Sequence, residues 1–422
     1  MSEVKNVPKL RFPEFTDDWE QCKVFDLLEL LTDYDANGSF ADMAKNVNTT
    51  DGDGYAWYVR ITDLENPKPL KELKYVDESS YKFLKKTELH GNELLMAKRG
   101  DIGKVYIFEP RTKYATVAPN MYLLKLNDKV IPHFLYDYFI SNEGNKKLTR
   151  LNASSTMGAL YKDDVKNIDV IMPSIEEQTM IGNFFQSLSH LITLNQQKYD
   201  SMLEYKKAML QKMFPKDGET VPEIRFPGFN GDWKQRKITE LSEVYIGLVT
   251  SMTEHYTNKG HLLIRNSDIK DGYFEFEENP IFLDDTFSLQ NKSRMHQLGD
   301  VITVHTGDIG TSAVIGKKEV NSIGFATIVT RPNQKVLDSN YLSVFLNTNI
   351  HKQWAISMAT GDGRSNYNLK DFTKLVIPIP SIEEQKKIAF TVCNLNNIIN
   401  LQKQKIELIK EYKKGLLQQM FI

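Results

Sequence analysis

The chain has 422 residues, of which 41% are hydrophobic and 26% charged, with a formal net charge of −2. This is the composition of a globular protein of two or three domains. The near-neutral charge disfavours a protein that binds nucleic acid without a partner through nonspecific electrostatic attraction to the phosphates. Local basic patches, or a more basic partner, remain compatible with DNA binding. No apolar run is long enough to cross a membrane, and the first ten residues lack the apolar segment of a signal peptide. The two cysteines, Cys22 and Cys393, lie outside any CxxC motif, which favours a reducing cytoplasm.

The chain contains one series of motifs twice. Three pairs mark the two copies: LRFPEF (10–15) and IRFPGF (224–229), VRITDL (59–64) and IRNSDI (264–269), and GDIG (100–103) and GDIG (307–310). The second member follows the first by 214, 205 and 207 residues respectively. Two copies are too few for a solenoid, so each copy is expected to form a domain of its own.

The fall in offset from 214 to 205 indicates a nine-residue insertion in the first copy. It lies within residues 32–55, which are rich in Asp, Asn and Gly and which we expect to form an exposed loop. Trp19 and Trp233 follow the first motif of each copy and are expected in the domain cores. The repeated pairs Arg60/Asp63 and Arg265/Asp268 are expected to be structural ion pairs.

Each copy mixes short β-rich runs with an amphipathic helical pattern. Strands are expected at 93–97, 105–108, 121–126 and 168–172 in the first copy, and at 301–304, 312–315, 327–330 and 375–379 in the second. Helices are expected at 132–148 and 339–354, and polar loops at 152–161 and 359–368. The predicted class is therefore α+β.

A long helix is predicted after the last strand of each copy. The sequence PSIEEQ opens both helices, at 173–178 and at 380–385, and the helices end near Met213 and Met420. Ser174 with Glu177, and the same pair 207 residues later, match a capping box, in which the serine accepts from the amide three residues on and the glutamate reaches back to the serine amide.

The two helices carry one heptad pattern in the same register. The seam residues of the first are Ile181, Phe185, Leu188, Ile192, Asn195, Tyr199, Met202, Lys206, Met209 and Met213, and adding 207 gives Ile388, Val392, Leu395, Ile399, Gln402, Ile406, Ile409, Lys413, Leu416 and Met420. Two amphipathic helices that each pack on their own domain would also show apolar faces. A heptad sustained over about 40 residues favours a paired coiled coil instead.

The direction of the pair follows from the size of the second domain. Each helix is a rod of about 60 Å, whereas a domain of this size usually has its ends close together. The end of the first helix and the start of the second are then neighbours, which predicts an antiparallel pair with a domain at each end and a pseudo-two-fold axis. The predicted segments are 1–173 (domain), 174–214 (helix), 215–380 (domain) and 381–422 (helix).

The search for catalytic and metal-binding motifs is negative. The sequence lacks a phosphate-binding GxxxxGK[ST] loop, a Rossmann glycine motif, HExxH and GxSxG, and its eight histidines are scattered. An active site built from residues far apart in sequence stays open at this stage. What the sequence does offer is side chains suited to recognition.

Candidate DNA contacts lie in two places in each copy. Basic groups suited to phosphates flank the first GDIG turn, and two polar residues hold the matching place in the second copy: Lys98, Arg99 and Lys104, and His305 and Thr306. The loops before the last strands carry groups suited to base edges: Asn152, Ser154, Ser155, Thr156 and Lys162, and Arg364, Ser365, Asn366, Tyr367, Asn368 and Lys370. The alternative for each is an ordinary solvated loop residue.

The duplicated order of motifs resembles the specificity subunit of type I restriction–modification systems over essentially the full chain. LRFPEF with Trp19, the GDIG turn and the PSIEEQ helix entry carry this resemblance. It implies two target-recognition domains separated by two long helices, with no catalytic activity and no cofactor in this chain. Each domain is then expected to read one half of a split double-stranded DNA target, while the helices set the gap.

The resemblance also implies the partners. Two methylation subunits would dock on the helices, bring S-adenosylmethionine and methylate adenine, and restriction subunits would add ATP- and Mg²⁺-dependent translocation and cleavage. Because the middles of the two copies differ, we expect an asymmetric, bipartite target. Three alternatives stay open: a stand-alone DNA-binding regulator, a fused restriction–methylation enzyme, for which motifs are lacking, and a coiled-coil adaptor without a DNA role.

Overall fold

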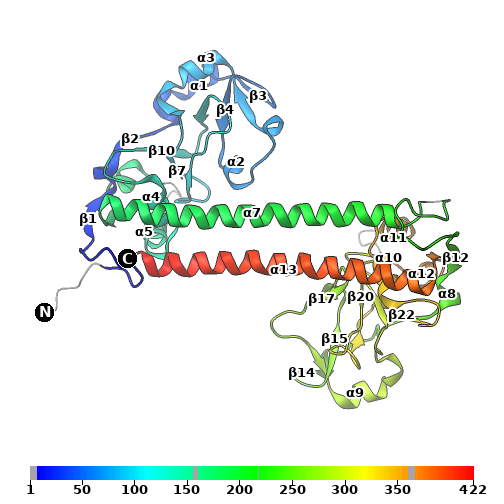
Figure 1. Ribbon diagram of the computed structural model, residues 1–422. Helices are drawn as coiled ribbons and strands as arrows, with labels where there is room; N and C mark the ends of the chain where they lie inside the picture. The colour runs from blue at the N-terminus through cyan, green and yellow to red at the C-terminus, as the bar shows by residue number, and fades with distance from the viewer. Residues whose placement is uncertain (1–6, 155–159, 217, 360–365) are drawn as a thin grey trace. The chain divides into compact units, whose positions relative to one another are not determined.

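The computed structural model describes residues 7–154, 160–216, 218–359 and 366–422 and has an α+β fold (Figure 1). It forms two compact units, Met1–Asn195 with Lys405–Ile422 (unit 1) and Gln196–Gln404 (unit 2). Each unit therefore combines one globular domain with half of each long helix. The two units are defined by contacts in space, whereas the four segments predicted from the sequence follow chain order. The boundaries of those four segments stay a prediction.

Unit 1 is built on a four-stranded antiparallel sheet. Its order is β2 (Leu28–Asp33), β10 (Met121–Leu126), β7 (Leu94–Ala97) and β8 (Val105–Ile107). All four residues of β7 are buried, as expected for a central strand covered on both faces. The second sheet has the order β3 (Thr49–Asp51), β5 (Lys74–Val76), β4 (Ala56–Val59), β9 (Ala115–Val117) and β6 (Glu88–Leu89), with β4 and β9 parallel. Strand β1 (Glu20–Lys23) pairs with β11 (Asp169–Met172). The helices are α1 (Phe40–Asn46), α2 (Ile61–Glu65), α3 (Glu78–Phe83), α4 (Pro132–Ile140), α5 (Asn142–Ser154) and α6 (Lys162–Lys166).

Unit 2 repeats this topology. The four-stranded sheet has the order β13 (Ser242–Ile246), β22 (Ile328–Pro332), β19 (Val301–Thr303) and β20 (Ser312–Val314). The second sheet has the order β14 (Tyr256–Thr257), β18 (Phe282–Leu283), β15 (His261–Ile264) and β21 (Ile323–Gly324), again with one parallel pair, β15 and β21. Strand β12 (Lys234–Lys237) pairs with β23 (Val376–Ile379), and β16 (Ile269–Lys270) and β17 (Tyr273–Phe274) form a separate hairpin. The helices are α8 (Ile238–Leu241), α9 (Asp285–Gln290), α10 (Ser339–Leu346), α11 (Asn349–Met358) and α12 (Leu369–Phe372).

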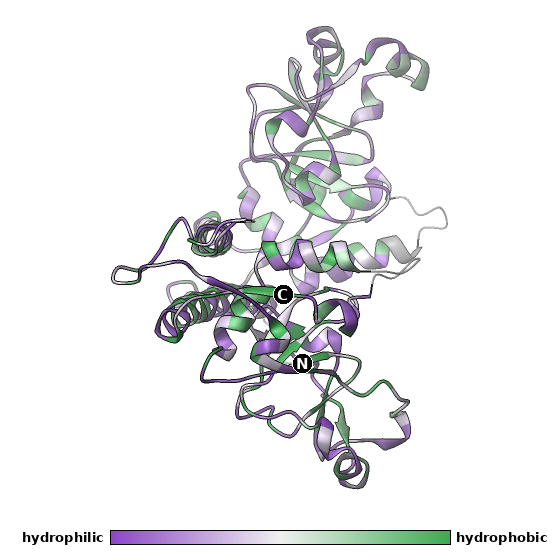
Figure 2. Cartoon of the chain, turned by 90° about the vertical axis from the view of Figure 1, so that its right-hand side faces the viewer, coloured by the Kyte–Doolittle hydropathy of each residue, from purple (hydrophilic) through white to green (hydrophobic). Residues whose placement is uncertain are grey.

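The long helices are α7 (Ile175–Met213) and α13 (Ile382–Met420), each of 39 residues (Figure 1). In unit 1 the start of α7 shares a core with the end of α13, through Phe185 and Met420, and in unit 2 the end of α7 meets the start of α13. In both units the start of one long helix packs against the end of the other, so the two helices pack antiparallel, as predicted. None of the twenty predicted seam residues is exposed. Figure 2, in which the long helices are seen end-on, shows that both carry hydrophobic and hydrophilic residues.

The two tryptophans are buried, as expected. Trp19 lies 6.4 Å from Phe421, ring centre to ring centre, and Trp233 lies 6.0 Å from Phe214. The two phenylalanines are 207 residues apart and follow the last residues of the long helices. Each unit therefore closes its core with the end of a long helix.

The LRFPEF and IRFPGF segments bind the ends of the long helices. In unit 1, Leu10 N donates to Gln419 O (3.0 Å) at the end of α13, and Arg11 donates two hydrogen bonds, 2.8 and 2.7 Å, to the carboxylate of Glu177 in α7. Arg225 makes the same pair with Glu384 in unit 2. The serine half of the predicted capping box is present, since Ser174 Oγ accepts from Glu177 N at 3.4 Å, whereas the glutamate carboxylate binds arginine.

Three predicted elements differ from the structure. The stretch 32–55, expected to be a loop, contains helix α1, whose Met43 is buried and whose Ser39 caps its first turn. The helix predicted at 132–148 breaks at Ser141, because the Ser141 hydroxyl accepts from Gly144 N and starts α5. Thr348 divides the helix predicted at 339–354 in the same way, by accepting from His351 N. Among the described residues, no helix is long and apolar enough to cross a membrane.

Candidate nucleic-acid interface

The two predicted groups of DNA contacts meet in each unit. The turn after β7 meets the loop before α6 where Leu160 N donates to Lys98 O at 3.1 Å. In unit 2 the turn after β19 meets the loop before α12 where Tyr367 N donates to His305 O at 2.9 Å. His305 and Tyr367 lie 207 positions after Lys98 and Leu160, so the two hydrogen bonds are equivalent in the repeat. Segments whose bonded residues are 62 positions apart in sequence thus meet in each unit.

In unit 2 this junction is held by polar side chains. Thr306 and Asn366 form an antiparallel bridge, and Thr306 Oγ1 donates to Asn366 Oδ1 at 2.8 Å. His305 Nδ1 lies 2.7 Å from Thr306 Oγ1, and its backbone N donates to Asn266 Oδ1 at 2.8 Å. Burial lowers the pKa of His305, so its imidazole is neutral at pH 7. These groups can hydrogen-bond a base edge without adding charge.

Other predicted contacts of unit 2 differ in exposure. Tyr367 is fully buried, and its hydroxyl lies 3.2 Å from Nε2 of the buried His351. Its side chain therefore belongs to the core of unit 2, and we do not retain it as a base contact. Asn368 precedes α12, and Lys370 is exposed on that helix.

In unit 1, two predicted lysine contacts form internal ion pairs. Lys98 Nζ donates to Asp33 Oδ2 (2.7 Å) and Asp35 Oδ2 (2.6 Å), and Lys162 Nζ donates to Asp33 Oδ1 (2.8 Å). Burial would raise the pKa of Asp33, but the hydrogen bonds from Lys162 and Lys98 outweigh it and lower that pKa. Lys98 is only 8% exposed. Because the ammonium groups of Lys98 and Lys162 are occupied by carboxylates, we retain neither as a DNA contact.

The remaining basic residues of this turn are exposed. Lys104 Nζ contacts Glu65 (2.8 Å) and Asp101 (2.5 Å), and the hydrogen bonds to Asp101 and Glu65 raise its pKa. Such exposed pairs exchange readily with other anions. Arg99 is exposed, and its side chain makes no hydrogen bond or ion pair with another residue of the described ranges. Arg99 is thus the basic group of this turn best placed to reach a ligand.

For six of the predicted contacts the structure describes the backbone alone or does not describe the residue. The backbones of Asn152 and Ser154 form the end of α5. Ser155, Thr156, Arg364 and Ser365 lie outside the described residues.

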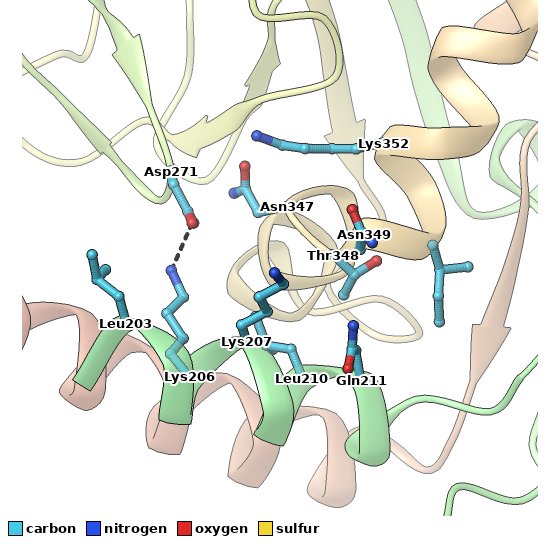
Figure 3. Close-up of a pocket in the computed structure, with 11 residues that line it drawn as sticks. Leu203, Lys206, Lys207, Leu210, Gln211, Asp271, Asn347, Thr348, Asn349 and Lys352 are labelled. Atoms are coloured by element: carbon cyan, nitrogen blue, oxygen red, sulfur yellow. Dashed lines mark hydrogen bonds and ion pairs between the residues drawn. The ribbon is translucent and has the colours of Figure 1, made fainter. Parts of the chain in front are cut away.

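Two cavities were not predicted from the sequence. One, of about 740 Å³ in unit 1, lies between α1, the turn at Lys98–Arg99 and the turn at Pro119–Asn120. The other, of about 230 Å³ in unit 2, lies beside α7. Figure 3 shows Lys206 of α7 reaching Asp271, which lies between β16 and β17, at 2.6 Å. The polar interruption of the seam at Lys206 was a signal for this cavity, but its partner Asp271 could not be identified from spacing.

Two further expectations concern structural and metal chemistry. The Arg60–Asp63 and Arg265–Asp268 pairs are present, at 2.7 and 2.8 Å, and both aspartates are buried. Within the described ranges, no three His, Cys, Asp or Glu side chains are grouped so that they could hold a metal ion.

Comparisons with known proteins identify the family. The model of the type I restriction modification DNA specificity domain matches residues 16–204 and 230–411. A putative type I restriction enzyme MjaX specificity subunit from Methanocaldococcus jannaschii is 22% identical over 98% of this chain and 95% of its own length. The type I restriction enzyme EcoBI specificity subunit from Escherichia coli is 30% identical, over 30% of this chain and 26% of its own.

Solved structures show the same fold. The crystal structure of the S subunit of a type I restriction–modification system from M. genitalium covers 99% of both chains with a TM-score of 0.57 at 14% identity. A chain from a structure on complex assembly and conformational transition of the type I R-M system covers 96% of this chain and 97% of its own, with a TM-score of 0.56 at 16% identity. With the duplicated family match, these findings show that the chain belongs to the type I restriction–modification DNA specificity family, as a non-catalytic specificity subunit.

Proposed function

We propose that this subunit reads an asymmetric, bipartite double-stranded DNA sequence, with one half-site per globular domain and a gap set by α7 and α13. The observation that carries this proposal is the repetition of one sheet and one loop junction in both units with different side chains at the junction. Lys98 and Arg99 of unit 1 correspond to His305 and Thr306 of unit 2. Two domains with the same sheet and loop junction but different side chains at the junction are suited to reading two different half-sites.

The contacts proposed for the two half-sites are those predicted from the sequence, without Lys98, Lys162 and Tyr367. In unit 1 they are Arg99 and Lys104, with Asn152, Ser154, Ser155 and Thr156 from the following loop. In unit 2 they are His305, Thr306, Asn366, Asn368 and Lys370, with Arg364 and Ser365. Arginine suits guanine, asparagine suits adenine, and hydroxyl groups suit several base edges.

The helices supply the spacing. A helix of 39 residues is about 58 Å long, at about 1.5 Å per residue. The antiparallel packing of α7 and α13, with no exposed residue along the predicted seam, supports their use as a ruler. Shortening both helices by one heptad is then expected to shorten the DNA gap.

The outward faces of the helices support two equivalent partner sites. In unit 1, four apolar side chains of these helices are more than 40% exposed: Leu191, Leu194, Leu408 and Tyr412. In unit 2 the residues that correspond to three of them are also exposed: Ile398, Leu401 and Tyr205. Exposed apolar groups that recur at equivalent positions of both units are suited to binding a protein partner. We propose that each set binds one methylation subunit.

The chemistry is then supplied by partners. Methylation subunits are proposed to bring S-adenosylmethionine and to methylate adenine, and restriction subunits to add ATP- and Mg²⁺-dependent translocation and cleavage, with no cofactor in this chain. The net charge of −2 supports a reader whose partners supply much of the DNA grip. A cytoplasmic location is proposed, consistent with two free cysteines.

The test is co-expression of the chain with its cognate methylation subunits, followed by sequencing of N6-methyladenine in the host genome. We expect two methylation subunits per chain and one methylated motif with two unequal halves and a fixed gap. A stand-alone regulator would instead bind one site tightly without partners and leave no methylation. That pair of results would contradict the proposal.

A further inference from the structure

The insertion in the first copy builds a cavity at the reading junction of unit 1. Helix α1 forms one wall, and the turns at Lys98–Arg99 and Pro119–Asn120 form the other. Lys98 N donates to Asn120 O at 2.8 Å, which ties these two turns together. Tyr34 and Tyr58, whose rings lie edge to face at 6.0 Å, also line the cavity. The cavity, of about 740 Å³, therefore has a rigid frame at the place where the two predicted contact groups meet.

Two side chains on the rim have no structural role of their own. Phe40, the first residue of α1, is 91% exposed, although Met43 on the same helix is buried in the core. Arg99 is exposed without a partner in the described ranges. Asp35 offsets the charge of Lys98, to which it is bonded at 2.6 Å, so Arg99 supplies the net positive charge of the cavity lining. An exposed phenylalanine and an exposed arginine that line the same cavity are suited to a ligand with both apolar and acceptor groups.

Unit 2 has no corresponding arrangement among its described residues. Between β13 and β14 the chain makes only the short 3₁₀ helix at Thr253–His255, and the position equivalent to Arg99 is Thr306, which is bonded to Asn366. The cavity and its rim are therefore specific to the first recognition domain.

We propose that this cavity is the base-reading site of the first domain, and that Phe40 and Arg99 are specificity-determining residues. Phe40 would contact the C5-methyl group of a thymine, and Arg99 would donate to N7 and O6 of a guanine, in the major groove of the first half-site. This inference rests on the proposed function. The chemistry fits because the thymine methyl is the apolar group of the major groove and a guanidinium matches the two guanine acceptors.

The test uses the full chain in its complex with the methylation subunits. Phe40→Ala, Arg99→Ala and Arg99→Lys are compared with wild type for methylation of genomic DNA, scored for every single-base variant of the motif. Phe25→Ala is the matched control, because Phe25 is also exposed, at 60%, on the short 3₁₀ helix Val24–Leu27 of the same unit. Because Phe40 and Arg99 are exposed, all variants are expected to keep the wild-type melting temperature.

The expected result is confined to one half-site. Arg99→Ala should lower the preference for one G·C pair roughly 5- to 150-fold, and Arg99→Lys should not restore it, since lysine lacks the paired donors. Phe40→Ala should relax selection at one thymine, and Phe25→Ala should change neither half-site. A uniform loss across all sequences that Arg99→Lys restores would overturn the inference, because it indicates a phosphate contact. Unchanged preferences in all variants would overturn it too, while a wild-type complex without any bipartite motif would overturn the proposed function itself.

Discussion

Loss of the Arg11–Glu177 pair is expected to destabilise unit 1 far more than loss of an exposed pair of the same residues. The Glu177 carboxylate is 1% exposed and accepts both hydrogen bonds from Arg11, which is itself 13% exposed. Removing one partner of a buried pair leaves an uncompensated charge, at a cost of about 3–5 kcal/mol. The positive end of α7 offsets part of this, so Arg11→Met should cost about 2–3 kcal/mol.

The assay is thermal unfolding by calorimetry, with hydrogen exchange of the first turns of α7 to locate the change. For a unit of about 210 residues, the shift corresponds to a fall in melting temperature of roughly 5–10 °C. Arg236→Met is the matched control, because Arg236 and Glu240 form a 2.5 Å pair in which each side chain is 45% exposed. Such a pair contributes about 0–1 kcal/mol. The double variant Arg11→Met/Glu177→Gln should recover most of the loss, since the buried charge is gone.

Two results would refute this reasoning. One is an equal, small effect of Arg11→Met and Arg236→Met, which would mean that burial does not strengthen the pair. The other is a double variant no more stable than Arg11→Met alone, which would mean that the lost stability does not come from the unpaired Glu177 carboxylate.

Three further predictions concern a buried acid, the partner sites and the reading domains. Burial raises the pKa of Asp137 to about 7, so the free energy of unfolding of unit 1 should fall as pH rises from about 4 to 7. Asp137→Asn should remove this pH dependence and stabilise the unit at pH 8 by up to about 4 kcal/mol. Melting temperatures of both proteins at pH 5 and pH 8 measure the effect. Leu194→Glu and Leu401→Glu should each release one methylation subunit, and together both, by native mass spectrometry; Leu70→Glu, at an exposed leucine of the first domain, should release none. Replacing residues 24–169 by those of another family member should change only one half-site of the methylated motif; a change in both would contradict independent reading.

Repetition made the topology and the long helices predictable. The offset stays at 207 residues from the GDIG motifs to the ends of the long helices and assigned equivalent strands there. The heptad pattern identified seam residues such as Asn195 and Lys206, all of which are at least half-buried. These features follow from local periodicity, which a sequence displays directly. Helix α1 has only seven residues, too few for its periodicity to stand out within residues 32–55.

The candidate site was only partly predictable, because its partners are distant in sequence. Lys98 looked available for phosphate, but Asp33 and Asp35, more than 60 residues earlier, bind its ammonium group. Tyr367 looked like a loop residue, yet it is fully buried beside His351. The pairing of a turn with the loop before the last strand, and the cavity beneath Phe40, depend on sheet packing that spacing does not reveal.

The spacer role of the helices is tested most directly by shortening them. Ser189 faces Lys413 in unit 1, at 2.7 Å, and the 207-residue repeat makes Lys206 and Asn396 the corresponding positions in unit 2. Residues 198–204 and 398–404 are then at the same level, and deleting both segments removes one heptad from each helix while keeping the seam. The pair shortens by about 10 Å, or about 3 base pairs. Methylome sequencing should give the same two half-sites with a gap shorter by up to about 3 base pairs, and an unchanged gap in an active complex would contradict the ruler.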